Sequence, residues 1–150
     1  HSDAARTHAV GEVSEEAKKL IQVTKESFFE GIKFAKAGNH LFDISGAIGR
    51  YAEERGYGVV RDLCGHGIGT ALHEAPEIPN YEVGRKGVRL RPGMTLAIEP
   101  MINIGTYEVD WLDDDWTVVT RDGSLSAHYE NTILITEGEP RILSLTCENE

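Results

Sequence analysis

The sequence is poor in cysteine, with only Cys64 and Cys147 among its 150 residues. The two form no Cys-x-x-Cys pair and nothing indicates a disulfide framework, so a reducing cytoplasm is the favoured location. The chain also has no apolar run approaching about 18 residues, the length of a membrane span, and no signal peptide. We therefore expect no membrane association, and the sequence shows no obvious signal for export.

Basic residues are also scarce. Lys and Arg total 15 against 25 Asp and Glu, a formal net charge of -10. This balance argues against nucleic acid as a partner, because phosphate binding needs basic patches. A negative field instead attracts cations, including metal ions and the ammonium group of a peptide. At 40% hydrophobic residues, 150 residues can bury one core, which predicts one domain spanning 1–150 or a large piece of one.

Two amphipathic helices are predicted in the first third of the chain. Ser14 is an expected N-cap, followed by apolar residues at three- and four-residue steps as far as Ala35, and Gly38 stops the helix. A second helix is expected from about Asp43 to Gly56. We expect both helices to cover one face of a sheet. Before them, residues 1–10 resemble the interior of a strand and carry no initiator Met.

Strand patterns dominate the remainder. Strands are predicted at 59–63, 94–99, 116–120 and 125–135, and residues 121–124 are a hairpin signal between the last two. An acidic cluster precedes that hairpin, but it lacks the glycine and spacing of an EF-hand loop. We interpret the cluster as a solvated hairpin tip rather than a metal site; its members are Asp110, Asp113, Asp114 and Asp115.

Imidazoles and carboxylates recur in the glycine- and strand-rich part of the sequence. His66 lies between Gly65 and Gly67, where the backbone can turn tightly and a substrate can approach. Glu99 ends a strand, and Glu130 lies within an apolar one, where burial is costly unless a cation or hydrogen bonds satisfy the carboxylate. Each alone has an ordinary alternative, a polar loop residue or a solvated strand face. Together they favour a metal site.

Other histidines have different expected roles. His73 is too far from His66 for a helical His-x-x-x-His pair, so we expect it to reach the site separately as a hydrogen-bond donor or proton shuttle. Strand alternation places His128 on the same face as Glu130. His1, His8 and His40 are interpreted as structural or surface residues.

Four ordered motifs contain these residues: Cys64-Gly65-His66-Gly67-Ile68-Gly69, His73-Glu74-x-Pro76, Pro92-Gly93-Met94-Thr95-x-x-Ile98-Glu99-Pro100-Met101 and Ser124-Leu125-Ser126-Ala127-His128-Tyr129-Glu130-x-Thr132. Together they resemble the motifs of type I methionine aminopeptidases, and the similarity runs from residue 1 to about 145. The last motif also separates the chain from proline dipeptidases and aminopeptidases P, which usually have Arg-x-Glu-Asp where this chain has His-Tyr-Glu-Asn.

The resemblance implies an α+β pita-bread (creatinase/aminopeptidase-like) fold, incomplete at the N-terminus, and a metallopeptidase catalytic domain of which 1–150 is the carboxy-terminal portion. It also implies residue roles. Asp3 and Glu130 match bridging metal ligands, whereas His66 and Glu99 match ligands of one metal. His73 matches a histidine at the scissile amide. Trp116 matches an aromatic residue of the methionine pocket. Leu72 stands where a family relative has an aromatic residue. His128 stands where family members carry Gln or a similar residue, and its role is left open.

The cofactors implied are two divalent ions per intact site, Co, Mn, Fe or Zn. The family's first aspartate, a ligand of the second metal, lies upstream of Asp3 and is absent. We therefore expect this chain alone to hold one ion far better than two.

The activity implied is removal of an N-terminal methionine from nascent proteins and peptides with a small second residue. Glu99 would take the water's proton, and His73 would stabilise the tetrahedral intermediate or help the leaving amide. The ribosome is a further partner in keeping with such substrates. Three alternatives stay open: an inactive fragment of an enzyme, a non-catalytic pita-bread peptide-binding module, and a relative of the proline-specific enzymes.

Overall fold

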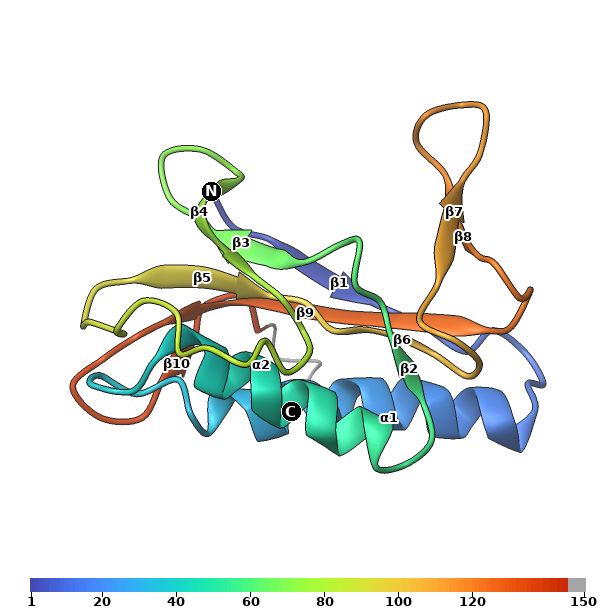
Figure 1. The fold of residues 1–150 in the computed structure, drawn as a ribbon, viewed down its shortest axis with the longest axis horizontal. Coiled ribbons are helices and arrows are strands. Elements are labelled where there is room, and N and C mark those ends of the chain that lie inside the picture. The colour runs from blue at the N-terminus through green and yellow to red at the C-terminus, as the bar shows by residue number, and fades with distance from the viewer. Residues whose placement is uncertain (146–150) are drawn as a thin grey trace.

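A computed structural model describes residues 1–145 as a layer of two helices packed on one face of a sheet (Figure 1). Cys147 lies outside the described residues. The helices are α1 (Glu15–Ile32) and α2 (Leu41–Glu53). The strands are β1 (Ala4–Arg6), β2 (Gly58–Val59), β3 (Gly65–Gly67), β4 (Glu74–Ile78), β5 (Thr95–Ile98), β6 (Met101–Asn103), β7 (Val109–Trp111), β8 (Val118–Thr120), β9 (Ser126–Leu134) and β10 (Arg141–Ile142).

Both predicted helices are confirmed, with shifted ends. The Ser14 hydroxyl caps α1 by accepting a hydrogen bond from the Ala17 amide at 3.1 Å. The helix ends at Ile32, earlier than the apolar spacing indicates. Helix α2 starts two residues before the predicted Asp43, because the Asp43 carboxylate accepts a hydrogen bond from the His40 amide and makes His40 the N-cap. The structural role expected for His40 is thereby confirmed.

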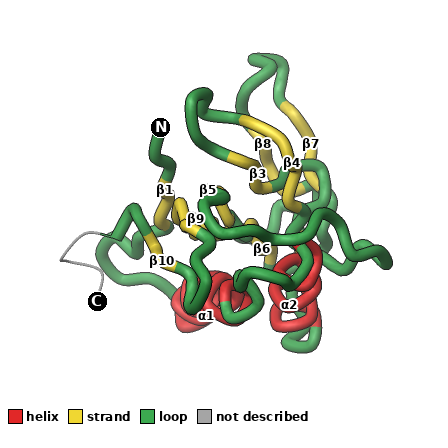
Figure 2. The backbone as a smooth tube through the Cα atoms, turned by 90° about the vertical axis from the view of Figure 1, so that its left-hand side faces the viewer, coloured by secondary structure: helices red, strands yellow, loops and turns green. Residues whose placement is uncertain are grey.

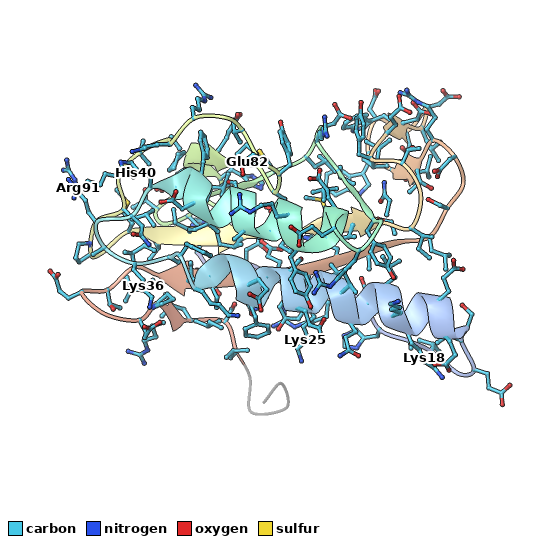
Figure 3. The ribbon with its side chains drawn as sticks, turned by 60° about the horizontal axis from the view of Figure 1, so that its bottom comes forward. Lys18, Lys25, Lys36, His40, Glu82 and Arg91 are labelled. Carbon is cyan, nitrogen blue, oxygen red and sulfur yellow. The ribbon has the colours of Figure 1, made fainter. Side chains whose placement is uncertain are left out.

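The two helices lie on the same side of the sheet, as predicted (Figure 2). Their apolar faces and the facing side chains of β5 and β9 form the main core, in which Phe28 packs 5.3 Å from Tyr129 between ring centroids. Figure 3 looks onto this helical layer, with Lys18 and Lys25 along α1 and Glu82 beside α2. No helix within residues 1–145 is both long enough and apolar enough to cross a membrane.

Strand β9 organises the sheet. The strand order is β2-β6-β9-β5-β3-β4, and β1 and β10 also pair with β9. Asn131 of β9 is opposite Ala4 of β1 and Ile98 of β5, so one strand has neighbours on both edges. Along β9, Tyr129 and Ile133 point into the helical core, as the predicted alternation requires. Glu130 therefore points to the face of the sheet that the helices leave uncovered.

Two strand predictions need correction. The strand expected at 59–63 is only β2, Gly58–Val59, and the chain turns outward where Arg61 and Asp62 are exposed. The segment 121–124 is a turn, but it does not join two paired strands, because β8 pairs with β7. The Asp122 carboxylate accepts a hydrogen bond from the Thr106 amide at 2.8 Å, which fastens this turn to the loop after β6.

The β7–β8 hairpin projects away from the main sheet (Figures 1 and 2). Asp113, Asp114 and Asp115 form its exposed tip, which confirms the interpretation of the acidic cluster as a hairpin end. Asp114 accepts hydrogen bonds from the Trp116 and Thr117 amides and from the Thr117 hydroxyl. Asp110 lies in β7 instead, where Arg121 donates to its carboxylate at 2.9 Å. The carboxylates thus shape the hairpin.

Candidate metal centre

A cavity of about 850 Å³ opens on the face of the sheet that lacks helices. Its lining combines carboxylates, imidazoles, a thiol and apolar side chains. The lining residues are Leu63, Cys64, Gly65, His66, His73, Glu74, Ala75, Glu77, Glu99, Met101 and His128. Three of the lining residues are acidic, Glu74, Glu77 and Glu99, and the Asp3 carboxylate lies 3.8 Å from His66 Nε2.

Strand pairing explains why polar residues from distant parts of the sequence meet here. His66 of β3 is opposite Ala97 of β5, two residues before Glu99. Glu130 of β9 is opposite Ala5 of β1, two residues after Asp3. Because β5 and β1 flank β9, these four polar side chains converge on one face of the sheet.

Two overlapping groups could each hold a metal ion. One consists of His66, Glu99 and Glu130, and the other of Asp3, His66 and His73; within each group the potential ligand atoms lie within 4.8 Å of one another. His66 belongs to both groups and is therefore central. The structure thus brings together all five residues that sequence analysis placed at the metal or the scissile amide.

The orientation of the His66 ring is fixed. Its Nδ1 lies 2.9 Å from the Gly67 carbonyl oxygen, and because a carbonyl only accepts, Nδ1 carries the proton. In the neutral ring the lone pair is then on Nε2, which lies 3.5 Å from Glu99 Oε1 and 3.8 Å from Asp3 Oδ2. A neutral imidazole with its second nitrogen bonded to a backbone carbonyl is the usual state of a metal-ligating histidine.

The glycines beside His66 permit close packing of the strands. A Cβ atom at Gly65 would collide with the Ala97 carbonyl oxygen, and one at Gly67 would collide with the Ala75 carbonyl oxygen. These contacts involve backbone atoms of β5 and β4, which cannot swing aside as a flexible side chain can. Glycine at both positions therefore lets β3 approach β4 and β5 closely, and His66 Nε2 then lies 3.5 Å from Glu99 Oε1.

Glu130 is an unsatisfied buried carboxylate. The residue is 4% exposed, and its Oε1 atom is shielded from solvent without a hydrogen-bond partner among residues 1–145. Burial, followed by repulsion from Glu99 and Asp3, raises the pKa of Glu130 to about 8, although Arg6 acts in the opposite direction. Such a group is costly unless a cation compensates it.

The donor set fits a divalent cation. Buried Glu130 Oε1 has no hydrogen-bond partner in the described part of the chain, and His66 Nε2 faces two carboxylates. The oxygen-rich set is of the type that suits Mn, Fe or Co. A cation placed among these atoms would remove the repulsion that raises the pKa of Glu130.

The other predicted residues occupy different positions. The His73 ring lies 4.3 Å from the His66 ring between centroids and lines the cavity. Trp116 does not line it; the side chain lies on the β7–β8 hairpin and is 86% exposed. Leu72 is also exposed. Of the remaining histidines, His8 is at the surface, and the His1 amino group donates to the Gly69 carbonyl at 2.8 Å.

Three residues gain importance from the structure. Asn80 is fully buried and its side-chain amide donates to the Glu99 carbonyl oxygen at 3.1 Å. Arg6 donates to Asn131 Oδ1 at 2.7 Å and to the Glu130 carbonyl oxygen, so it holds β1 against β9. His128 Nε2 lies 3.4 Å from Glu99 Oε2. Only the position of His128 beside Glu130 gave a signal in the sequence, because a single Asn or Arg in a strand or loop has many uses.

A sheet-borne cluster of carboxylates and imidazoles beside an open cavity is typical of a metal-dependent hydrolase. Comparison with known families makes this more specific: residues 1–137 match Metallopeptidase family M24. The chain belongs to this family, whose members use divalent metal ions.

Similar curated proteins are methionine aminopeptidases. That of Clostridium acetobutylicum is 61% identical over 146 residues, which cover 97% of this chain and 58% of the relative. Methionine aminopeptidase 1 of Bacillus subtilis is 53% identical over 137 residues, covering 91% of this chain and 55% of the relative. The chain thus spans little more than half the length of these relatives.

Solved structures confirm the pita-bread fold. Methionine aminopeptidase of Thermotoga maritima superposes with a TM-score of 0.93 at 50% identity, covering 97% of this chain and 58% of that one. Prolidase of Pyrococcus furiosus superposes with a TM-score of 0.73 at 28% identity, covering 97% and 37%. The same fold therefore spans both kinds of enzyme, and this chain is more similar to the first.

Proposed function

We propose that this chain forms the metal-binding part of an aminopeptidase that removes N-terminal methionine from proteins and peptides with a small second residue. The observation that carries the proposal is the position of His66, whose free Nε2 faces both Glu99 and Asp3 beside a substrate-sized cavity. Its relatives at 45–61% identity are named methionine aminopeptidases. The prolidase and X-Pro aminopeptidase structures are 24–28% identical, which disfavours a proline-specific activity.

We assign four ligands to one cation: Asp3, His66, Glu99 and Glu130. Asp3 and Glu130 would be the two carboxylates shared with a second cation, for which the assigned set contains no further ligand. The oxygen-rich donor set supports Mn, Fe or Co over a thiolate-type zinc site. Retention of all four ligand residues disfavours a binding module that has lost its metal.

A bound divalent cation supplies Lewis acidity and makes hydroxide available from water near neutral pH. Glu99 is the proposed proton acceptor for the attacking water, because its carboxylate faces the cavity and its backbone is held by Asn80. His73, at the same wall, is the proposed donor to the oxygen or nitrogen of the scissile amide. The acidic lining attracts the free α-ammonium group that defines an aminopeptidase substrate.

Nascent chains are the proposed natural substrates, the ribosome is a proposed partner, and the cytoplasm is the proposed compartment. Trp116, on the projecting hairpin, is the proposed aromatic wall of the methionine pocket. The Trp116 side chain is largely exposed, so a methionine pocket that includes it needs further contacts to enclose the substrate side chain.

Methionine release from Met-Ala-Ser and Met-Lys-Ser, with Mn²⁺ or Co²⁺ added, tests the proposal. Release from the first peptide alone, abolished by a chelator and by His66→Ala, is the expected result for a self-sufficient chain. Release that survives chelation, or full activity of Glu99→Ala, would refute the assignment. A silent chain that still binds Mn²⁺ through His66 would mean that the residues assigned here form the cation site of a larger catalytic unit.

A further inference from the structure

His128 lies beside the proposed proton acceptor, and its role was open from the sequence. The ring is about one-third exposed, with 35% of its side-chain surface accessible, but Nε2 itself is shielded from solvent. No atom among residues 1–145 makes a hydrogen bond of standard geometry to this nitrogen. It faces two carboxylates instead, Glu99 Oε2 at 3.4 Å and Glu130 Oε2 at 4.0 Å.

The Glu99 carboxylate is thus held between two imidazoles. Its Oε1 atom faces His66 Nε2 at 3.5 Å, whereas its Oε2 atom faces His128 Nε2 at 3.4 Å. The two imidazoles differ in what fixes the proton of a neutral ring. His66 Nδ1 donates to the Gly67 carbonyl, so a neutral His66 ring leaves Nε2 as an acceptor. Within residues 1–145 no such bond holds a proton on His128 Nδ1, and the groups facing His128 Nε2 are carboxylate oxygens, so a neutral His128 ring gains a hydrogen bond when its proton is on Nε2.

The backbone of His128 is also fixed. Its amide donates to the Thr7 hydroxyl at 2.8 Å, and that hydroxyl donates to the His128 carbonyl at 3.0 Å. On the other side of β9, His128 is opposite Met101 of β6, which follows Glu99 by two residues. The His128 backbone is therefore held in place close to Glu99. A residue that orients a metal ligand needs such a fixed backbone.

We propose that His128 is a positioning residue that donates a hydrogen bond from Nε2 to Glu99 Oε2 and directs Glu99 Oε1 toward the cation. This inference deepens the proposed function and rests on Glu99 being a cation ligand. Carboxylate ligands are commonly oriented by a second hydrogen bond of this kind. A bound cation would draw the Glu99 carboxylate into place and would shorten the 3.4 Å separation, because hydrogen bonds of this kind are often long before the ligand binds.

Two measurements test the inference. The first needs no cation: long-range ¹H–¹⁵N spectra of the chain in chelator report which His128 nitrogen carries the proton. A protonated Nε2 whose signal shifts in Glu99→Gln is expected. A neutral ring protonated only at Nδ1 would overturn the inference, because a bare Nε2 can accept or ligate but cannot donate.

The second measurement is Mn²⁺ affinity by calorimetry for three variants. His128→Leu keeps side-chain bulk without a donor and should weaken binding about 10- to 100-fold, whereas His128→Gln keeps an amide donor and should stay within about threefold of the parent. His8→Leu, at the exposed surface, is the control for losing a histidine and should bind as the parent does. Unchanged affinity in His128→Leu, or equal losses in the Leu and Gln variants, would overturn the inference. If the parent binds no Mn²⁺, the proposed function fails, and the spectra still decide the position of the His128 proton.

Discussion

The guanidinium carbon of Arg6 lies 4.0 Å from the centre of the Tyr129 ring, directly across the pairing of β1 with β9. Arg6 also donates to Asn131 Oδ1 and to the carbonyl oxygens of Ala5 and Glu130. Tyr129 is buried, so its ring is backed by the helical core while the cation covers its other side. One side chain therefore fastens the strand that follows Asp3 to the strand that carries Glu130.

Loss of Arg6 should destabilise the chain. We expect Arg6→Ala to reduce the free energy of unfolding by about 2–3 kcal/mol, because hydrogen bonds and a cation–π contact are lost together. Urea unfolding measures this change. The control is Arg91→Ala, a substitution at an exposed arginine. Arg6→Lys should recover only part of the loss, since an ammonium group cannot reproduce the planar set of donors. Equal stability of Arg6→Ala and the parent would show that β1 is held by backbone pairing alone.

The elements that could be predicted from sequence are those with local signals. The capped, amphipathic helices α1 and α2 carry such signals, and so does the alternation along β9 that puts Glu130 and Tyr129 on opposite faces. Strands β3 and β4 carry almost none, because Gly65-His66-Gly67 has no apolar alternation. Their pairing depends on backbone contacts that only glycine allows.

Contacts between residues far apart in the sequence were the second feature that the sequence could not predict. The turn at 121–124 indicates a hairpin locally, but Asp122 binds the Thr106 amide and β8 pairs with β7. The site motifs were easier to recognise than the contacts that orient them. Asn80 holds the Glu99 backbone from 19 residues away, and no local pattern reports a contact of that range.

Gly67→Ala should be strongly destabilising. An added Cβ collides with backbone atoms of Ala75 and Glu74, so β3 and β4 must separate. We expect a loss of more than about 3 kcal/mol, the range of severe steric substitutions. Gly138→Ala is a matched control, because a Cβ there has no heavy atom within 4 Å. Thermal unfolding compares the two, and similar melting temperatures would contradict the close packing described for β3.

The pKa of Glu130 predicts a pH dependence of the chain without metal. A carboxyl group whose pKa is raised to about 8 in the folded state, against 4.5 ordinarily, binds more protons when folded, so stability falls as pH rises between those values. In chelator, Glu130→Gln should therefore melt higher than the parent at pH 9 and close to it at pH 4. Exposed Glu12→Gln is the control. A Glu130→Gln advantage that does not grow with pH would show that the carboxylate is not penalised by burial.

The lowered pKa of Asp122 predicts that the chain loses stability in acid. A hydrogen bond from the Ser124 hydroxyl, with those from the Thr106 and Ser124 amides, lowers the pKa of Asp122 from 3.8 to about 2. Its contribution to stability is therefore complete above pH 4 and is lost as pH falls toward 2. Asp122→Asn should flatten the stability profile in that range, whereas Asp113→Asn at the exposed hairpin tip should leave it unchanged. Equal acid sensitivity of the parent and Asp122→Asn would contradict this role.

Cation binding itself should appear as added stability that depends on His66. A ligand that binds only the folded chain stabilises it by about 2.7 kcal/mol at 100 times its dissociation constant, so saturating Mn²⁺ should raise the melting temperature of the parent. His66→Asn removes the nitrogen that faces Glu99 and Asp3, and the Mn²⁺-dependent rise should disappear while the melting temperature in chelator changes little. His8→Asn, which removes an exposed histidine, should keep the full rise. If His66→Asn were stabilised by Mn²⁺ as strongly as the parent, the cation would bind elsewhere, and the centre built around His66 would be refuted.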